Sequence, residues 1–323
     1  MMKSINDVNI QPGTRAFVRG DLDVPIENGQ ILEKYRLDAM LPTLKLLKEK
    51  QTKIIIAGHI KRPKGVIDEK LSTKQLIPYF NENLGEGNFE LLENLRFDIR
   101  EEQNDESYAK ELAAKADIYV NESFSTSHEN HASVVGIPKL IPGYAGLRLE
   151  LEVLTIKKIL KDAARPLIAI VGGAKLESKK PAVLKLLKIA DLVLVGGRIG
   201  NNWNSALPAN MRIPKDYAEF GKDIGKRTIE EYEQLIQTAK TIVWVGPLGA
   251  YEEEKFAQGT NIIAKAVVDS GAFSLAGGGD TVAALNNAGM LGKFSFISTG
   301  GSAMLEFICN ETLVGLKVLG YEN

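Results

Sequence analysis

Short apolar runs rich in valine and isoleucine alternate with amphipathic stretches of helical period along the whole chain. The runs that predict strands are 14–18, 53–57, 88–92, 117–120, 166–171, 191–195, 241–245, 273–276 and 294–298. Helical patterns lie between them, for example at 36–50, 107–116 and 228–240. Near-continuous apolar strands that alternate with helices are typical of parallel sheets covered on both faces. The pattern therefore predicts an α/β fold built on parallel sheets.

The length of 323 residues fits two domains of ordinary size. We expect the first domain at 1–150 and the second at 151–305. A stretch of helical period, about 147–163, is predicted to connect them, and the segment 306–323 is expected to pack back on the first domain.

The residues that follow the strands differ between the two halves. Ligands of parallel sheets bind at the carboxyl ends of the strands, so these residues are the informative ones. In the second half they are glycines, as in VGGAKLESKK, VGGRIGNN, VGPLGAYEEE, AGGGDTVAAL and STGGSAMLE. In the first half they are charged or carry imidazoles, as in VRGDLDVP, GHIKRPKG, ENLRFDIREE and VNESFSTSHENHAS. Both arrangements hold anions, the first through bare backbone and the second through basic side chains.

The glycine junctions of the second half predict a phosphate site. Lys175 and Lys179 lie four residues apart at a helix start, where cations are disfavoured by the helix dipole, and this indicates an anionic ligand; Pro181 fits a first helical turn. Asp280 is placed to cap the next helix or to hold Mg²⁺ that accompanies nucleotide phosphates, and the two roles are compatible. No G-x-x-x-x-G-K-[ST] or clean G-x-G-x-x-G motif is present, so neither a P-loop protein nor a Rossmann dehydrogenase is indicated.

In the first half, Arg36, Arg62 and Arg96 lie in separate loops or helix starts, near positions equivalent to those of Asp21, His59 and His131. A zinc site from His128 and His131 is compatible with their spacing, but no further ligand is evident. A serine hydrolase is weakly supported because no G-x-S-x-G motif is present.

The composition of the chain limits the partners, disulfides and cellular compartment that we expect. The formal net charge of −1 argues against nucleic acid as a partner. The single cysteine, Cys309, excludes an intrachain disulfide. No apolar signal-peptide core or long apolar run is present, so we expect a cytoplasmic protein without membrane contact.

Taken in order, these loops resemble the phosphoglycerate kinase family over essentially the full chain. The matching stretches include VRGDLDVP, LPTLKLL, GHIKRPKG, LLENLRF, DIYVNESF with HENHAS, IVGGAKLESK, VWVGPLGAYE, FAQGT, GGGDT and STGGSAMLE. The resemblance implies two doubly wound, Rossmann-like domains facing each other across a hinged cleft. It further implies a monomer that transfers a phosphoryl group between 1,3-bisphosphoglycerate with ADP and 3-phosphoglycerate with ATP.

The resemblance also assigns residues. The substrate-binding positions would be Asp21, Asp23, Arg36, His59, Arg62 and Arg96. The nucleotide-binding positions would be Gly172, Gly173, Lys175, Lys179, Gly196, Gly197, Pro247, Gly249, Glu252, Gly278 and Asp280, with Asp280 toward Mg²⁺ and Glu252 at the ribose hydroxyls. The catalytic set would be Arg36, Lys175 and the helix start at Gly300 and Gly301. The acceptor is already an anionic carboxylate, so catalysis would consist of alignment and charge stabilisation during hinge closure.

The sequence departs from the family pattern in the anion site. Asp23 stands where the family has asparagine, Glu129 where it has arginine, and Lys61 where it has glycine. A unit charge about 5 Å from a phosphate is worth roughly 3 kcal/mol at an effective dielectric near 20. Either Lys61, Arg100 or Arg148 compensates for Glu129, or Glu129 turns away, or the substrate lacks the distal phosphate.

The nucleotide side departs as well. Val245 replaces an amide, Arg198 and Ser302 each replace a glycine, and the second domain is trimmed after Trp203 and between about 215 and 225. The alternatives to a phosphoglycerate kinase are a kinase for a related acyl phosphate and a non-catalytic nucleotide-binding protein.

Overall fold

The protein consists of two units in a computed structural model that describes residues 2–174, 176–203 and 206–322. The first unit contains the residues up to Leu154 and the chain from Thr312 onward, and the second unit contains Thr155–Glu311. The boundary between them lies inside α5 (Leu147–Asp162). The stretch predicted as a C-terminal segment begins at Glu306, inside α11 (Ser302–Asn310) of the second unit.

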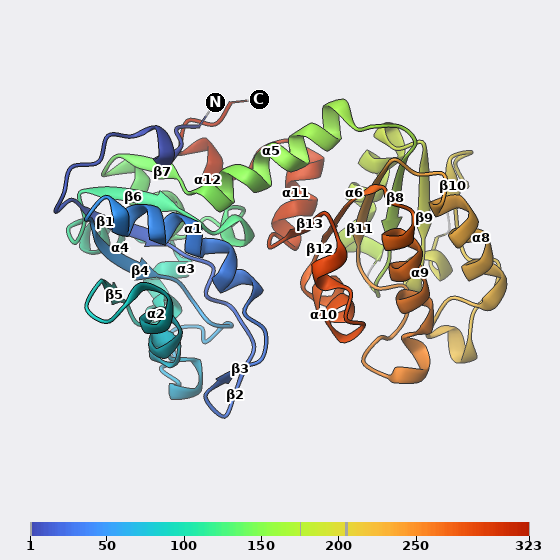
Figure 1. Cartoon of the computed structure of the whole chain (residues 1–323), viewed down its shortest axis with the longest axis horizontal. Helices are drawn as coiled ribbons and strands as arrows, with labels where there is room; N and C mark the ends of the chain where they lie inside the picture. Colours follow the sequence, from blue (N-terminus) through green and yellow to red (C-terminus); the bar gives the residue numbers. More distant parts are fainter. Residues whose placement is uncertain (1, 175, 204–205, 323) are drawn as a thin grey trace. The chain divides into compact units, whose positions relative to one another are not determined.

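The first unit is built on a five-stranded sheet in the order β5-β4-β1-β6-β7 (Figure 1). Its strands are β1 (Arg15–Arg19), β4 (Lys53–Ala57), β5 (Phe89–Leu91), β6 (Ile118–Asn121) and β7 (Gly143–Ala145). All neighbouring strands pair in parallel. The apolar runs predicted four of these strands, whereas β7 is a three-residue edge strand with no apolar run of its own.

Helices cover this sheet and close its core. They are α1 (Tyr35–Glu49), α2 (Ile77–Leu84), α3 (Ile99–Glu102), α4 (Glu106–Ala113), the first part of α5, and α12 (Val314–Lys317). Leu37, Leu44 and Leu47 of α1 pack in one cluster with Val18 and Ile56 of the central strands. A two-stranded antiparallel hairpin, β2 (Ile26–Glu27) with β3 (Gln30–Ile31), follows the first strand.

The second unit is built on a six-stranded sheet in the order β10-β9-β8-β11-β12-β13 (Figure 1). Its strands are β8 (Leu167–Val171), β9 (Leu192–Val195), β10 (Met211–Arg212), β11 (Thr241–Val245), β12 (Phe273–Gly277) and β13 (Phe296–Ser298). All pair in parallel. Every position of β8 and β11 is buried, which explains their unbroken apolar sequence. The two-residue strand β10 was not predicted.

The helices of the second unit alternate with these strands. They are the end of α5, α6 (Leu176–Ile189), α7 (Gly197–Asn201), α8 (Lys226–Ile236), α9 (Gln258–Asp269), α10 (Gly279–Asn287) and α11. The predicted α/β class with two parallel sheets is therefore confirmed. Within the part of the chain that the structure describes, no helix combines the length and the apolar composition needed to cross a bilayer.

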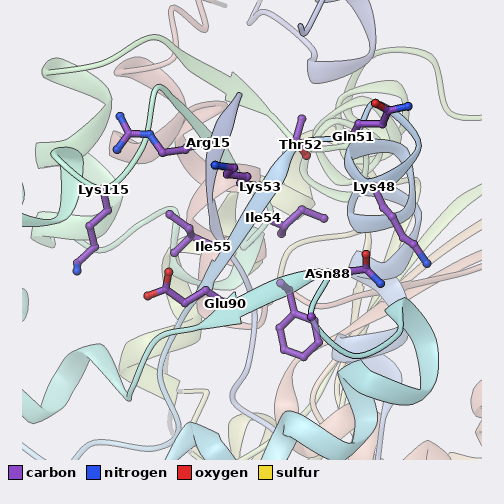
Figure 2. A pocket seen from close by; sticks show the side chains of 12 residues that line it. Arg15, Lys48, Gln51, Thr52, Lys53, Ile54, Ile55, Asn88, Glu90 and Lys115 are labelled. Carbon is purple, nitrogen blue, oxygen red and sulfur yellow. The ribbon is translucent and has the colours of Figure 1, made fainter. Parts of the chain in front are cut away.

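A cavity of about 670 Å³ lies at the amino ends of the first sheet and carries no predicted site residue (Figure 2). Arg15 and Lys53, the first residues of β1 and β4, contribute to its lining. The basic groups there are partly engaged already, because Arg15 is paired with Asp117 at 2.6 Å and Lys48 donates to the carbonyl of Leu84. The predicted ligand residues of the first unit belong to the opposite edge, where the strands end.

Glu122 connects the end of β6 to the first turn of α5. Its Oε1 accepts hydrogen bonds from the hydroxyl of Thr43 at 2.7 Å and from the backbone N–H of Arg148 at 3.1 Å. The side chain is 1% exposed, and burial raises the pKa of Glu122 to about 8. A folded state that holds the proton more tightly than the unfolded state loses stability as pH rises.

We therefore expect Glu122→Gln to flatten the pH dependence of stability. In the parent, the free energy of unfolding should fall as pH rises from about 4.5 to about 8, because in this window the unfolded state releases the proton of Glu122 while the folded state keeps it. Glutamine keeps the acceptor for Thr43 and Arg148 without titrating, so the variant should gain more than about 1 kcal/mol relative to the parent at the alkaline end. Urea unfolding at both ends of the window measures this, with the exposed Glu86→Gln as control; parallel pH profiles for parent and Glu122→Gln would contradict it.

Candidate functional site

Arg19 ends β1 and lies fully buried at the carboxyl edge of the first sheet. Its Nε donates to the hydroxyl of Ser133 at 2.8 Å and its Nη1 donates to the carbonyl of Gly20 at 2.5 Å. The third contact joins Nη2 to Nδ1 of His59 at 3.1 Å. Arg19 thus connects loops that follow three different strands.

The contact with Arg19 fixes the tautomer of His59. A guanidinium only donates, so Nδ1 of His59 accepts and Nε2 carries the proton. Burial, followed by the charges of Arg19 and Arg96, holds the pKa of His59 well below its usual range. At neutral pH His59 is therefore a neutral donor through Nε2–H.

The side chain of Arg36, in the first turn of α1, forms an ion pair with Asp21. Nη1 of Arg36 lies 2.9 Å from Oδ1 of Asp21, whereas Oδ2 of Asp21 is buried without a hydrogen-bond partner. The nearby Asp21 raises the pKa of Arg36. The carboxylate therefore holds the guanidinium in place and keeps it charged.

Asp23 and Arg96 hold the loop that follows β4. Oδ1 of Asp23 accepts the backbone N–H of Lys61 at 2.9 Å, and Nη1 of Arg96 donates to the Lys61 carbonyl at 3.1 Å. Lys61 needs this support because its φ of 57° is unusual outside glycine. The carboxylate of Asp23 thus positions the loop that carries His59 and the exposed Arg62.

Glu129 lies between two imidazoles. Its Oε1 is 3.6 Å from Nε2 of His128, and its Oε2 is 3.7 Å from Nε2 of His131. Glu129 also acts on Arg96, whose pKa is lowered by burial and by Arg19 but raised in part by the Glu129 charge. Glu129 therefore lies among His128, His131 and Arg96 and does not turn away from them.

Both arginines that were expected to compensate for the charge of Glu129 are already paired with other carboxylates. Arg100 contacts Asp98 at 2.6 Å and Glu111 at 3.2 Å. Arg148 contacts Glu152 at 2.8 Å and donates to the Tyr35 hydroxyl. Of the three cations expected to compensate, Lys61 is the remaining candidate, and its side chain is exposed.

The second unit contains a cavity of about 420 Å³ at the carboxyl edge of its sheet. It is lined by residues of five chain segments, namely Gly173, Ala174, Gly197, Arg198, Gly221, Lys222, Pro247, Gly249, Ala250, Tyr251, Glu252, Glu253 and Asp280. Six predicted nucleotide-binding residues are among them: Gly173, Gly197, Pro247, Gly249, Glu252 and Asp280. Glycine is the most frequent residue type in this wall, so backbone groups can approach a ligand closely.

The glycines behind the cavity allow neighbouring strand ends to touch. A Cβ on Gly172 would lie 2.1 Å from the Pro247 carbonyl oxygen, and one on Gly246 would lie 2.1 Å from that of Gly172. Lys179 reaches across this junction, with Nζ donating to the Gly172 carbonyl at 2.5 Å. Burial lowers the pKa of Lys179, and the charge of Asp280 opposes this shift.

The helix starts differ in part from the sequence prediction. Pro181 is the sixth residue of α6 rather than part of its first turn, because the helix begins at Leu176. The prediction that Asp280 caps α10 is wrong, since Gly278 is the N-cap and makes no side-chain cap hydrogen bond. Asp280 lies in the first turn, exposed, and its carboxylate is available to a ligand of the cavity.

The predicted catalytic helix start is present. α11 begins at Ser302 after Gly301, whose φ is 47°. The N–H of Gly300 is engaged, because it donates to the hydroxyl of Ser298 at 3.0 Å. Ser302 and Lys179 line one further cavity of about 470 Å³. Lys175 lies outside the described residues.

Four further positions singled out in the sequence, Gly196, Gly278, Val245 and Arg198, lie in or next to the second sheet and its cavity. Gly196 is buried, and a Cβ there would lie 2.4 Å from the side chain of Leu248. Gly278 adopts a φ of 105° before α10. Val245 is 2% exposed within β11, so it is a core residue. Arg198 lines the cavity.

Three charged side chains that lie in or beside the two sites were not selected from the sequence. Arg19 was not selected, although a charged residue at the end of an apolar strand is a signal that could have found it. Glu101 is fully buried and accepts hydrogen bonds from Ser133, and burial raises its pKa. Lys222 lines the 420 Å³ cavity of the second unit and pairs with Glu253 at 2.6 Å.

The fold and the two sites define a class of protein. One parallel sheet presents guanidinium groups around a neutral histidine, and the other presents a glycine-walled cavity with a lysine and a carboxylate. Such a pair of anion sites on two α/β units is typical of enzymes that transfer phosphoryl groups from nucleotides to small acids.

The phosphoglycerate kinase family model matches residues 5–89, 80–219 and 204–311. Phosphoglycerate kinase from Leptospira biflexa is 37% identical over 95% of this chain and 96% of its own. That from Rhodospirillum centenum is 34% identical over 98% of this chain and 99% of its own. The chain belongs to the phosphoglycerate kinase family. The Leptospira alignment runs over 378 positions, more than the 323 residues here, so these relatives contain segments that this chain lacks.

Two solved structures of phosphoglycerate kinases have the same fold as this chain. Phosphoglycerate kinase from Coxiella burnetii is 28% identical and superposes with a TM-score of 0.84, covering 99% of both chains. That from Pyrococcus horikoshii OT3 is 29% identical with a TM-score of 0.85, covering 99% of this chain and 98% of its own.

The glycine junction gives a direct test. Gly172→Ala would push a methyl group against the Pro247 carbonyl, so we expect a loss of about 1–3 kcal/mol in unfolding free energy and weaker MgADP binding. Gly292→Ala is the control, because its Cβ would meet nothing within 4 Å. Denaturant unfolding and calorimetric titration of MgADP measure both effects. If Gly172→Ala matched the control in both, the close contact would not matter.

Proposed function

We propose that this protein is a phosphoglycerate kinase that transfers a phosphoryl group reversibly between 1,3-bisphosphoglycerate with ADP and 3-phosphoglycerate with ATP. The observation that carries the proposal is the guanidinium cluster around His59. Its histidine is a fixed, neutral donor and its arginines are charged, so the cluster holds an anion and offers no evident base. That suits an acceptor that is already a carboxylate and needs no deprotonation.

In this proposal the first unit binds the phosphoglycerate. Arg36, Arg62 and Arg96 supply positive charge, and His59 donates from Nε2. Asp21 and Asp23 act by holding Arg36 and the loop after β4 in position. Arginine forks match the planar geometry of carboxylate and phosphate oxygens, which fixes the acceptor for in-line attack.

In the second unit the glycine-walled cavity binds the nucleotide, with Glu252 at the ribose. Lys179 and Lys175 stabilise negative charge on the phosphates, and the start of α11 adds the positive end of its dipole. Asp280 fits a role toward Mg²⁺, since a single exposed carboxylate together with phosphate oxygens is a usual magnesium environment. When bound, the ion would neutralise charge on the transferring group. Hinge closure completes the proposal, and the protein acts as a cytoplasmic monomer on small molecules, without nucleic acid or membrane.

Arg36→Ala tests the proposal. In a coupled assay of ATP consumption with 3-phosphoglycerate and Mg²⁺, we expect kcat to fall by at least about a hundredfold, because the variant loses a charge that stabilises the transferring group. Arg15→Ala is the matched control: Arg15 lies at the opposite edge of the same sheet and should keep kcat within about twofold. A parent without turnover that still binds MgADP would favour a non-catalytic nucleotide-binding protein.

Glu129 favours a second candidate, a kinase for an acyl phosphate without the distal phosphate. Its carboxylate lies within the cluster, while Arg100 and Arg148 are paired elsewhere. A negative charge in this place repels a distal phosphate, and it does not repel a substrate that lacks this phosphate.

The variant Glu129→Gln separates the two candidates. If 3-phosphoglycerate is the substrate, removing the charge should lower its KM about tenfold or more, with the KM for ATP unchanged. Glu106→Gln, on the exposed face of α4, is the control. Unphosphorylated glycerate is assayed as an alternative substrate beside 3-phosphoglycerate. Faster turnover of glycerate in the parent, with no gain for 3-phosphoglycerate in Glu129→Gln, would establish the second candidate.

A further inference from the structure

Glu101 is a fully buried carboxylate in the short helix α3, beside the guanidinium cluster. Charged side chains are almost never fully buried unless their polar atoms are paired. Oε2 of Glu101 accepts the backbone N–H of Ser133 at 2.9 Å, and its Oε1 accepts the Ser133 hydroxyl at 2.5 Å. Ser133 lies in the single helical turn Ala132–Gly136, which follows β6. Both carboxylate oxygens therefore bind the same buried residue.

The carboxylate of Glu101 acts on the nearest guanidinium through Ser133. In the part of the chain that the structure describes, no ion pair joins Glu101 directly to Arg19, and the Ser133 hydroxyl bonds to both. Burial raises the pKa of Glu101, and the charge of Arg19 opposes this rise. Nδ1 of His131 lies 3.9 Å from Oε1 of Glu101, which is too far for a hydrogen bond. The hydrogen bonds of this carboxylate are thus made to Ser133.

The hydroxyl of Ser133 has a single proton, and this proton sets the direction of the bonds beyond it. An ionised carboxylate only accepts, so the proton points to Glu101. The hydroxyl oxygen is then free to accept Nε of Arg19 at 2.8 Å. Nη2 of the same guanidinium donates to Nδ1 of His59 at 3.1 Å. Three hydrogen bonds therefore lead from the carboxylate of Glu101 to the imidazole of His59, and each has one direction.

This hydrogen-bond chain decides where His59 carries its proton. The protonated nitrogen of a neutral imidazole is set by the bond that the other nitrogen makes. Arg19 and Ser133 are both 0% exposed, so no bulk water replaces a bond that is lost between them. A buried network in which every bond is made holds one geometry, and a partly broken one does not. The fixed donor of His59 thus depends on a carboxylate that it does not touch.

We propose that Glu101 and Ser133 are positioning residues of the first site, which act through Arg19 to keep the proton of His59 on Nε2, where it donates to the bound substrate. This inference rests on the proposed function, since it takes 3-phosphoglycerate to be the anion that His59 meets. Neither Glu101 nor Ser133 contacts the substrate in this proposal. Their effect is to make the donor ready before the anion arrives.

Two variants break the hydrogen-bond chain at different links. Glu101→Gln keeps the shape of the side chain, but an amide has one acceptor oxygen and an NH₂ donor, so it cannot accept both donors of Ser133. Ser133→Ala removes the acceptor for Nε of Arg19. Glu106→Gln, on the exposed face of α4, is the matched control.

The first readout is the tautomer of His59, measured by proton–nitrogen NMR correlation on protein with labelled histidine. The His59 signals are assigned by their absence in His59→Gln. We expect the parent and the control to show only the Nε2–H form at neutral pH, and both variants to show a mixture of the two tautomers. A carboxylate that only stabilised the fold would lower the midpoint of urea unfolding in the variants and leave the His59 signals unchanged, which would overturn the inference.

The second readout is calorimetric titration with 3-phosphoglycerate and, separately, with MgADP. We expect each variant to bind 3-phosphoglycerate about tenfold more weakly and MgADP as the parent does. The double variant should also lose about tenfold, because both substitutions break one chain. Parental affinity for 3-phosphoglycerate in both variants would contradict the inference. The tautomer is measured without substrate, so a parent that shows the fixed form but binds no 3-phosphoglycerate would refute the proposed function and leave the hydrogen-bond chain standing.

Discussion

Parallel strand pairing is the constraint on which both candidate sites depend. Since every strand of a parallel sheet runs in the same direction, all loops after the strands meet at one edge. In the first unit this brings Arg19, at the end of β1, together with His59 and Arg96 from the segments that follow β4 and β5. In the second it brings Gly172 against Gly246, the residues directly after the central strands. The chemistry of each edge then follows from which residue type ends each strand.

The buried charges of the first unit are arranged to orient donors. Arg19 is fully buried, and its bonds to Ser133, Gly20 and His59 satisfy its guanidinium while they fix the imidazole. Because one nitrogen of His59 is taken, the other is the proton donor. A preorganised donor of this kind needs no rearrangement when the anion arrives, which is the physical basis of electrostatic stabilisation.

Apolar runs carry enough information for the strands but not for the details of the site. All nine predicted strands exist, whereas β2, β3, β7 and β10 were not predicted, because strands of two or three residues are too short to show a periodicity. Gly173 and Gly197, which the glycine junctions predicted as nucleotide-binding residues, both line the cavity of the second unit. The orientation of Glu129 could not be predicted, since a carboxylate next to two histidines turns toward whichever partner the fold supplies.

The charge balance of the first site is less adverse to an anion than its formal count of carboxylates indicates. The carboxylate of Asp21 contacts one nitrogen of Arg36, and Asp23 is bound to a backbone N–H rather than to an arginine. Glu102 lies 3.4 Å from Nε of Arg96, which nevertheless lacks a hydrogen-bond partner. A guanidinium has five N–H donors, so each of these pairs leaves donors for a ligand. The carboxylates thus act mainly as supports that aim the arginines, and a substrate can bind without breaking them. Glu129 is the exception, because its partners are imidazoles and not guanidiniums, so its carboxylate does not orient an arginine.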